Sequence, residues 1–284
     1  MAGMSINTNM DALAIENTLS NTNSAVSSSL QKLSTGLNIN SAADDPAGYA
    51  IANSFSAKIS AMQVASQNAN QATSMLQTAD GAYSQINNIL VQMKSLATEA
   101  ASGQESPSDL SSLNGEFSDL QNEIDQIAGS TQYGSINVID GNTTATGGIT
   151  FQIGATYSTD NTLVVKFNGA TTDCLGVSGT AQHVSISTLA SAQAAMNAID
   201  TALTSINAYM GNVGGMQNQL SYTINNITTS IQNYTSSEST IEDVNMASEV
   251  STLTKNQILQ QSAMAMLAQA NAEPQNVLKL LQSI

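Results

Sequence analysis

Few side chains in this 284-residue sequence are of types that carry out chemistry, and they do not cluster. There is one histidine, His183, and one cysteine, Cys174. A histidine-based metal site, a zinc-binding HExxH helix or a Ser-His-Asp triad needs more than this single histidine provides. A lone cysteine cannot close an intrachain disulfide, so we expect Cys174 to be a small buried side chain.

Two adjacent acidic pairs, Asp44-Asp45 and Glu242-Asp243, are the remaining candidates for acid–base chemistry. Both pairs lie where a predicted helix begins or ends, and carboxylates at such boundaries usually cap the helix. The sequence has neither a phosphate-binding GxxxxGK[ST] loop nor a glycine-rich dinucleotide loop. We therefore predict no enzymatic activity, with no catalytic residue, no cofactor-binding residue and no metal ligand.

The charge balance argues against several classes of partner. Lysine and arginine together number 6 against 21 aspartates and glutamates, which gives a net charge of −15, and all the basic residues are lysines. A surface that neutralises phosphates needs clustered basic side chains, so we expect no nucleic-acid partner and no membrane partner. No apolar stretch approaches the roughly 18 residues of a membrane span. We also expect no secretory signal peptide, because residues 1–9 have no basic region and no apolar core.

Helices are the elements that must position these residues. Aromatic residues make up only 4% of the chain, so Ala, Leu, Ile and Met must fill the core, and these residues suit helix-on-helix packing. Charged residues make up only 10%, and the remaining polar residues are mostly Ser, Thr, Asn and Gln. Such a surface fits a chain that mostly faces copies of itself.

Small and apolar residues recur in steps of three and four over two long segments. The first stripe is Met62, Ala65, Ala69, Ala72, Leu76, Ala79, Tyr83, Ile86, Leu90, Met93, Ala97 and Ala100. The second is Ile199, Leu203, Ile206, Met210, Val213, Leu220, Ile224, Ile227, Ile231, Tyr234 and Ile241, interrupted by Gln217 and Glu238. This heptad spacing is typical of coiled coils. We predict that the two segments are long helices that pair antiparallel.

Shorter helical stripes occur at both ends of the chain. The first is Leu19, Val26, Leu30, Leu33 and Leu37. The last is Val250, Leu253, Ile258, Met264, Leu267, Val277, Leu278, Leu280 and Leu281. Neither stripe has a partner nearby in the sequence, so we expect them to pair with each other, with neighbouring copies, or with both.

Turn residues divide the helices and mark a β-rich insert. Asp-Pro at 45–46 starts a helix and Gly103 ends it, while Ser-Pro at 106–107 starts a third helix that closes near Gly129. Between residues 134 and 188 glycine and threonine become dense, and 148–154 and 162–167 alternate like strands. An insert of this size has no core of its own, so it must lean on the helices.

The predicted fold class is mainly α: long antiparallel coiled-coil helices, in a terminal-helix domain plus a helical-bundle domain, with a small β-hairpin insert. Residues 1–45 and 242–284 are the terminal helices of an inner coiled-coil domain. Residues 46–133 and 189–241 are the N-terminal and C-terminal helices of an outer rod domain, and residues 134–188 are its β-hairpin insert.

The sequence resembles bacterial flagellin over its whole length. The most specific segments are LQKLSTGLNINSAADDPAG at 30–48 and TKNQILQQSAMAMLAQAN at 254–271. Further segments similar to family blocks lie at 6–9, 76–82, 140–141, 151–155, 175–176 and 214–220. The large variable outer domains of many flagellins are missing, because the insert has only about 55 residues.

The resemblance implies a structural subunit that polymerises into the bacterial flagellar filament used for motility. It implies secretion through the flagellar type III export apparatus and an extracellular location in the flagellum. The implied partners are other copies in a helical homopolymer, hook-associated and cap proteins, and an export chaperone that binds the C-terminal helix. A hook–filament junction protein and a secreted adhesin remain the alternatives.

The helix stripes provide the candidate assembly residues: Leu30, Leu33, Leu37, Leu90, Leu96, Leu220, Ile224, Ile258, Leu267 and Leu281. By resemblance, Gln92, Leu96 and Glu116 correspond to the surface that an innate-immune toll-like receptor reads on flagellins. The family commonly has arginine where this chain has Asn38, Gln92, Met210 and Gln219. We therefore expect weak receptor activation and a filament that depends less on salt bridges.

The insert and its loops are expected to face solvent. Asn142, Thr143 and Thr144 form an N-x-T sequon and are candidates for glycosylation. Candidate O-glycan sites are Thr146, Thr150, Thr171, Thr172 and Ser178. An unmodified polar loop is the alternative.

Overall fold

A computed structural model of the chain describes residues 9–141, 148–179 and 184–282. The long helices are α1 (Met10–Thr35), α2 (Pro46–Ala100), α3 (Pro107–Ser130), α6 (Leu189–Glu242) and α7 (Met246–Gln282). The shorter elements are β1 (Gln132–Tyr133), β2 (Ile136–Asn137), β3 (Ile149–Gln152), η1 (Thr159–Asn161), β4 (Thr162–Val165) and α5 (Thr172–Leu175). The fold is mainly α with a small β-hairpin insert, as the sequence predicts, and a second antiparallel strand pair, β1 with β2, follows α3.

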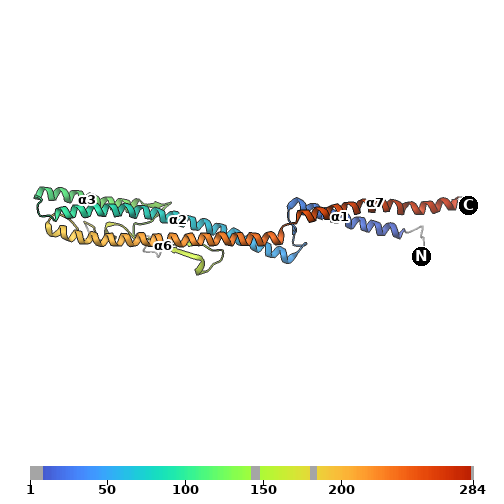
Figure 1. Ribbon diagram of the computed structural model, residues 1–284, viewed down its shortest axis with the longest axis horizontal. Helices are drawn as coiled ribbons and strands as arrows, with labels where there is room; N and C mark the ends of the chain where they lie inside the picture. The colour runs from blue at the N-terminus through green and yellow to red at the C-terminus, as the bar shows by residue number, and fades with distance from the viewer. Residues whose placement is uncertain (1–8, 142–147, 180–183, 283–284) are drawn as a thin grey trace. The chain divides into compact units, whose positions relative to one another are not determined.

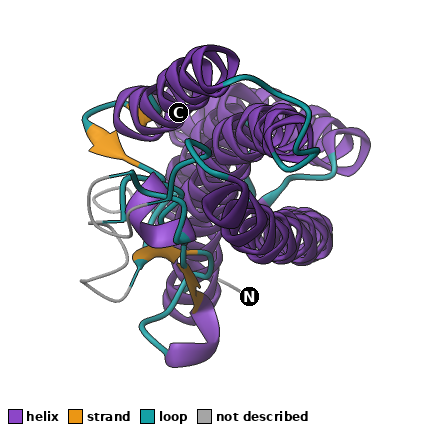
Figure 2. Cartoon of the chain, turned by 90° about the vertical axis from the view of Figure 1, so that its left-hand side faces the viewer, coloured by secondary structure: helices purple, strands orange, loops and turns teal. Residues whose placement is uncertain are grey.

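The chain forms two compact units, whose boundaries fall within α2 and α6. The central unit is Lys58–Gln232, and the terminal unit combines Met1–Ala57 with Asn233–Ile284. In the central unit α2, α3 and α6 run beside one another (Figure 1). Seen from the end, the strands lie along one side of the helices (Figure 2).

The first predicted stripe is the core of the central unit. Every residue of that stripe except Met62 is buried, from Ala65 to Ala100. Six of the buried positions of this stripe, up to Ala79 and beyond Met93, are alanines, which allow neighbouring elements to approach α2 closely. The heptad spacing in the sequence therefore identifies the buried face of α2 correctly.

Helix α6 packs on α2 in the antiparallel sense that the sequence predicts. The Lys94 side chain forms an ion pair with Asp200, and the ring centroids of Tyr83 and Tyr209 lie 5.9 Å apart. As the residue numbers fall along α2 they rise along α6, which fixes the direction and register of the pair. The buried face of α6 is Ala192, Ala195, Ile199, Ala202, Ile206, Val213 and Leu220.

Helix α3 begins with a capping box. The hydroxyl of Ser106 accepts a hydrogen bond from the backbone N–H of Asp109, and the Asp109 carboxylate accepts one from the backbone N–H of Ser106. Pro107 occupies the first turn, where its missing N–H costs nothing. Phe117, Ile124 and Ala128 are buried on the side of α3 that faces the core. The helix continues one residue beyond Gly129, to Ser130.

The insert leans on the helices, as its small size requires. Strands β3 and β4 pair antiparallel, with Ile149 opposite Val165 and Gln152 opposite Thr162. Leu163, Val165, Phe167, Val177 and Ile186 are buried in the same core as α2, α3 and α6.

Tyr83 ties the insert to α2. Its hydroxyl donates a hydrogen bond of 2.7 Å to the carbonyl of Asn168, and burial raises the pKa of the phenol well above its usual range. Close by in the sequence, a Cβ atom at Gly169 would lie 2.6 Å from the Cα atom of Gly141. Only glycine allows the two backbone segments to meet this closely.

A polar row on α3 holds the C-terminal part of the insert. The Asn114 side-chain oxygen accepts from the backbone N–H of Ile186, at 2.9 Å. The buried Gln121 amide donates to the carbonyls of Val177 and Val184, at 2.6 and 3.1 Å. One turn further on, the Asp125 carboxylate accepts from the backbone N–H and the hydroxyl of Thr172, at 2.8 Å each. These residues are spaced by seven and four positions, which places them on one face of the helix.

We predict that Gln121→Ala lowers the free energy of unfolding of the central unit by about 2 kcal/mol, because it leaves two carbonyl groups without their donor. Urea unfolding of the full chain, followed by circular dichroism, measures the change. Asn122→Ala is the matched control, since Asn122 is the exposed neighbour on the same helix. Equal midpoints for the two variants would contradict the role of Gln121.

Candidate interaction surface

The two terminal helices pair with each other, which is one of the arrangements expected from the sequence. The Asn9 amide donates to the carbonyl of Ala270 at 2.8 Å, and the Gln260 amide donates to the side-chain oxygen of Asn23 at 2.6 Å. Residue numbers therefore run in opposite directions along α1 and α7, which lie side by side in Figure 1. Within the terminal unit, α1 and α7 thus form an antiparallel helix pair.

Backbone hydrogen bonds join the two connections of this unit. Gly36 ends α1 in the left-handed region, with φ of 77°, and its carbonyl accepts from the N–H of Val244 at 2.9 Å. The N–H of Asn38 donates to the carbonyl of Glu242 at 2.6 Å. The segment after α1 is therefore fixed against the segment that joins α6 to α7.

The acidic pairs serve these turns as hydrogen-bond acceptors. One carboxylate oxygen of Asp44 accepts from the backbone N–H groups of Asn40 and Ser41, at 3.1 and 2.9 Å. Asp45 precedes Pro46 and accepts from the N–H of Ala47 at 3.0 Å, so it caps α2 as the sequence predicts. The Asp243 carboxylate accepts from the hydroxyl of Ser239.

Hydrogen bonds from Asn40 and Ser41 lower the pKa of Asp44 below its usual value. A carboxylate whose pKa is lower in the folded chain stabilises the fold at pH values above its unfolded pKa. That contribution is lost as the pH falls through the lowered value. Asp44 therefore supports this turn near neutral pH.

The seam between α1 and α7 buries little large apolar surface. On α1 it consists of Ala12, Ile15, Leu19, Thr22, Val26, Ser29 and Leu33, and on α7 of Leu253, Asn256, Gln260, Ala263, Leu267 and Ala270. Among the described side chains of these two helices, those that are buried rather than half-buried are Thr22, Ser29 and Ala263. Four of these thirteen seam positions are threonine, serine, asparagine or glutamine, so a search for apolar residues alone misses them.

Large apolar side chains instead point outward from the pair. On α1 they are Met10, Leu13 and Leu30, and on α7 they are Met246, Val250, Ile258, Leu259, Met264 and Met266. Ile258 precedes the seam residue Gln260 by two positions, which places it about 160° around the helix from that residue. Together with Ser251, Thr254 and Lys255, Ile258 and Leu259 line a shallow groove on α7. Helix α7 therefore exposes apolar residues on sides that α1 does not cover.

The candidate assembly residues separate into three groups. Leu90, Leu96 and Leu220 are buried in the core of the central unit, and Ile224 is half-buried beside it. Leu33, Leu37 and Leu267 are half-buried in the terminal unit. Leu30 and Ile258 are exposed, with about half of each side chain accessible. Leu281 belongs to α7, and its side chain lies outside the described part.

The residues that the resemblance assigns to a receptor surface lie close together. Gln92 on α2 and Glu116 on α3 are both exposed, and the Gln92 amide donates to the Glu116 carboxylate at 3.4 Å. Leu96 is only 8% exposed and packs inward beneath them. The exposed part of this surface is therefore the amide–carboxylate pair.

Two expectations about the insert are wrong. Thr172 and Ser178 are buried rather than solvent-facing, because Asp125 and the α3 surface cover this segment, so neither hydroxyl is accessible for a glycan. Cys174 is exposed rather than buried, because Thr172 and Leu175 are the residues of α5 that face inward. His183, Asn142, Thr143, Thr144 and Thr146 lie outside the described residues.

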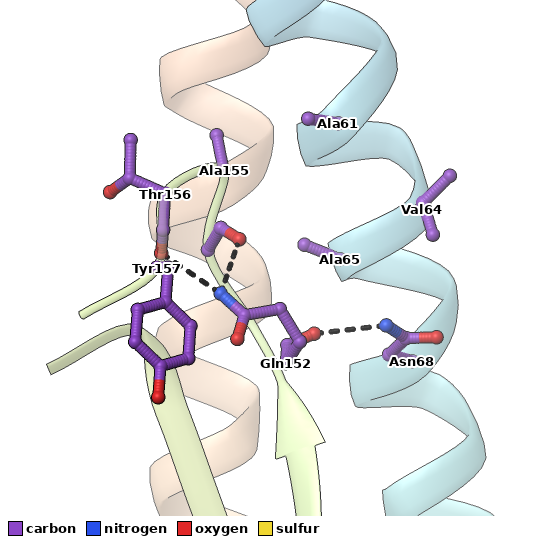
Figure 3. A pocket seen from close by; sticks show the side chains of 9 residues that line it. Ala61, Val64, Ala65, Asn68, Gln152, Ala155, Thr156 and Tyr157 are labelled. Carbon is purple, nitrogen blue, oxygen red and sulfur yellow. Dashed lines mark hydrogen bonds between the residues drawn. The ribbon is translucent and has the colours of Figure 1, made fainter. Parts of the chain in front are cut away.

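A shallow groove lies between the loop after β3 and helix α2 (Figure 3). Ala61, Val64, Ala65 and Asn68 line it from α2, and Gln152 and residues 154–157 line it from the insert. The Asn68 amide donates to the Gln152 carbonyl at 3.0 Å, which holds the strand against the helix. The Gln152 amide in turn donates to the carbonyls of Gly154 and Thr156.

Within the described residues, no helix combines the length and the apolar character that a membrane span requires.

Comparisons with known families match both ends of the chain. A family model described as the bacterial flagellin N-terminal helical region matches residues 6–144. A second model, the bacterial flagellin C-terminal helical region, matches residues 196–281. Together the two models cover α1, α2, α3 and most of α6 and α7.

Similar proteins align over nearly their whole length. The flagellin of Bacillus subtilis (strain 168) is 38% identical over 307 aligned positions, which cover 98% of this chain and 100% of the relative. The flagellar filament 33 kDa core protein of Treponema phagedenis is 35% identical over 288 positions, with 98% and 100% coverage. The crystal structure of Bacillus cereus flagellin is 31% identical, covers 57% of this chain and 88% of that chain, and has a TM-score of 0.48. The chain therefore belongs to the bacterial flagellin family and is a structural subunit of the flagellar filament.

Proposed function

We propose that the outward faces of α1 and α7 are the surface through which copies of this subunit polymerise. The single observation that carries this proposal is the set of large apolar side chains that these two helices expose. A helix that is apolar on several sides is normally surrounded, and α7 has one partner helix within the described terminal unit. Further copies of the same pair would supply the missing neighbours.

The contacts between copies are expected to be apolar or amide-based. The chain has no arginine, and two of the positions where relatives commonly have it, Gln92 and Gln219, carry exposed amides. At a third position Asn38 accepts a hydrogen bond of 2.9 Å from the Lys32 ammonium group. Met210, at the fourth, is half-buried against the core of the central unit.

The same surface would need protection before assembly. We propose that an export chaperone covers α7 in the unassembled chain, and that hook-associated and cap proteins contact the terminal unit at the two ends of the filament. Secretion through the type III flagellar apparatus would deliver the subunit to the extracellular filament tip. These proposals rest on the resemblance to flagellin together with the exposed apolar faces.

We predict that Ile258→Asp abolishes filament formation by the purified chain, because it places a charge on the apolar side of α7 opposite the seam. Negative-stain electron microscopy after addition of sulfate should show long filaments of constant diameter for the unchanged chain. Ile258→Leu is the matched control and should assemble. Short rings from the unchanged chain would favour a hook–filament junction protein, and monomers only would favour an adhesin or a subunit that needs a partner.

Raising the salt concentration is expected to leave the filaments intact. Salt screens ion pairs, but it also screens the repulsion between subunits that each carry a net charge of −15. Sedimentation of preformed filaments from about 0.05 M to about 1 M NaCl measures the polymerised fraction. Sharp dissociation at the higher concentrations would show that ion pairs hold the filament together.

The receptor-like surface leads to a separate proposal. We propose that the chain activates the toll-like receptor for flagellin weakly, because Gln92 offers one amide where an arginine would offer a charged fork of donors. Glu116 is already beside this position, so a guanidinium group at residue 92 would lie next to a carboxylate.

Gln92→Arg is therefore expected to raise receptor potency by about tenfold. A cell reporter assay measures the concentration at half-maximal response for the unchanged chain and the variant. Gln92→Lys is the control for charge alone. The proposal fails if the unchanged chain is as potent as a flagellin that carries arginine at this position.

A further inference from the structure

The methionines that the structure describes divide sharply between the two units. In the terminal unit Met10, Met246, Met264 and Met266 are 66%, 50%, 49% and 58% exposed. In the central unit the described methionines are buried or half-buried: Met62, Met75, Met93, Met196, Met210 and Met216. Among the described residues, the four exposed methionines thus all lie on the helices that form the proposed assembly surface.

We propose that these four methionines are oxidation sites, and that their conversion to the sulfoxide stops a subunit from adding to a filament. This proposal rests on the assembly surface proposed above. The co-reactant is a peroxide. One oxygen of hydrogen peroxide forms an S–O bond with the thioether, the O–O bond breaks, and the other oxygen leaves as water. Sulfur loses two electrons and the peroxide gains them.

Exposure makes the reaction selective. Oxidation of a thioether needs contact with the oxidant, so Met75 and Met93, which are 1% and 0% exposed, are shielded by the core of the central unit. The four methionines of the terminal unit are shielded only once another subunit covers them. Oxidation would therefore affect the free subunit and spare the assembled one.

The chemical change acts directly on the contact. Methionine is a flexible apolar side chain that adapts to an irregular surface, whereas the sulfoxide is polar and accepts hydrogen bonds. On α7 the outward side chains around Met264 and Met266 include the apolar Ile258 and Leu259 as well as the polar Gln261 and Ser262. Burying the sulfoxide against a similar apolar surface would leave its oxygen without a partner.

The first test maps the reaction. The monomeric full chain is treated with hydrogen peroxide and cleaved after lysine, which places Met264 and Met266 on the peptide 256–279 and Met75 and Met93 on 59–94. We expect peptide 256–279 to gain two oxygen atoms well before Met75 and Met93 react. In preformed filaments the same peptide should react more slowly. Equal rates in monomer and filament would overturn the proposal.

The second test measures assembly. We expect peroxide treatment to raise the critical concentration for filament formation by about tenfold or more. All variants carry Cys174→Ser, because that thiol is exposed and also reacts with peroxide. The variant with leucine at positions 10, 246, 264 and 266 should assemble equally well before and after treatment. The control with leucine at positions 75 and 93 should stay sensitive.

The outcomes distinguish a failure of the oxidation proposal from a failure of the assembly surface on which it rests. If Ile258→Asp assembles as well as the unchanged chain, the assembly surface itself is wrong. If the treated chain assembles at an unchanged critical concentration, or if the leucine variant at positions 10, 246, 264 and 266 remains sensitive, only the oxidation proposal is wrong. Recovery of assembly after treatment with methionine sulfoxide reductases and a thiol reductant is the expected result.

Discussion

Antiparallel pairing between helices from opposite halves of the chain is the interaction on which both units depend. Lys94 meets Asp200 and Tyr83 meets Tyr209 in the central unit, while Asn23 meets Gln260 in the terminal unit. Neither half can bury its stripe alone. The backbone hydrogen bonds of Gly36 with Val244 and of Asn38 with Glu242 therefore help to fix the register in which the terminal helices pair.

The two units differ in how much of their apolar surface this pairing covers. Alanines along α2 let neighbouring helices approach closely, and the insert covers the remaining side with residues such as Phe167 and Val177. The terminal pair has no third layer among its described residues, and its seam contains Thr22 and Ser29. A stable core in one unit and uncovered apolar faces in the other suit a subunit that folds in one part and polymerises through another.

Periodic features of this structure can be predicted from the sequence, and local polar contacts cannot. The stripe from Ala65 to Ala100 can be recognised in a single sequence by its regular spacing. The cap residues Ser106 and Asp45 can be recognised by their types and by the proline that follows each. The hydrogen bonds from Gln121 to the carbonyls of Val177 and Val184 cannot be predicted in this way, because the loop that provides these carbonyls has no repeating sequence pattern. The inward position of Ser29 is equally hard to predict, because an apolar pattern does not count a serine.

The loop after β3 has a consequence for how the chain could be lengthened. The N–H of Ile153 donates to the carbonyl of Asn161 at 2.8 Å, so a backbone hydrogen bond holds the two ends of the loop together. Between them Tyr157 is fully exposed. Doubling the length of a flexible loop costs only about 0.6 kcal/mol in closure entropy. Extra residues, or a whole folded domain, inserted beside Tyr157 would leave the hydrogen-bonded ends of the loop and the helices unchanged. Every subunit of the filament would then carry one copy of the inserted domain.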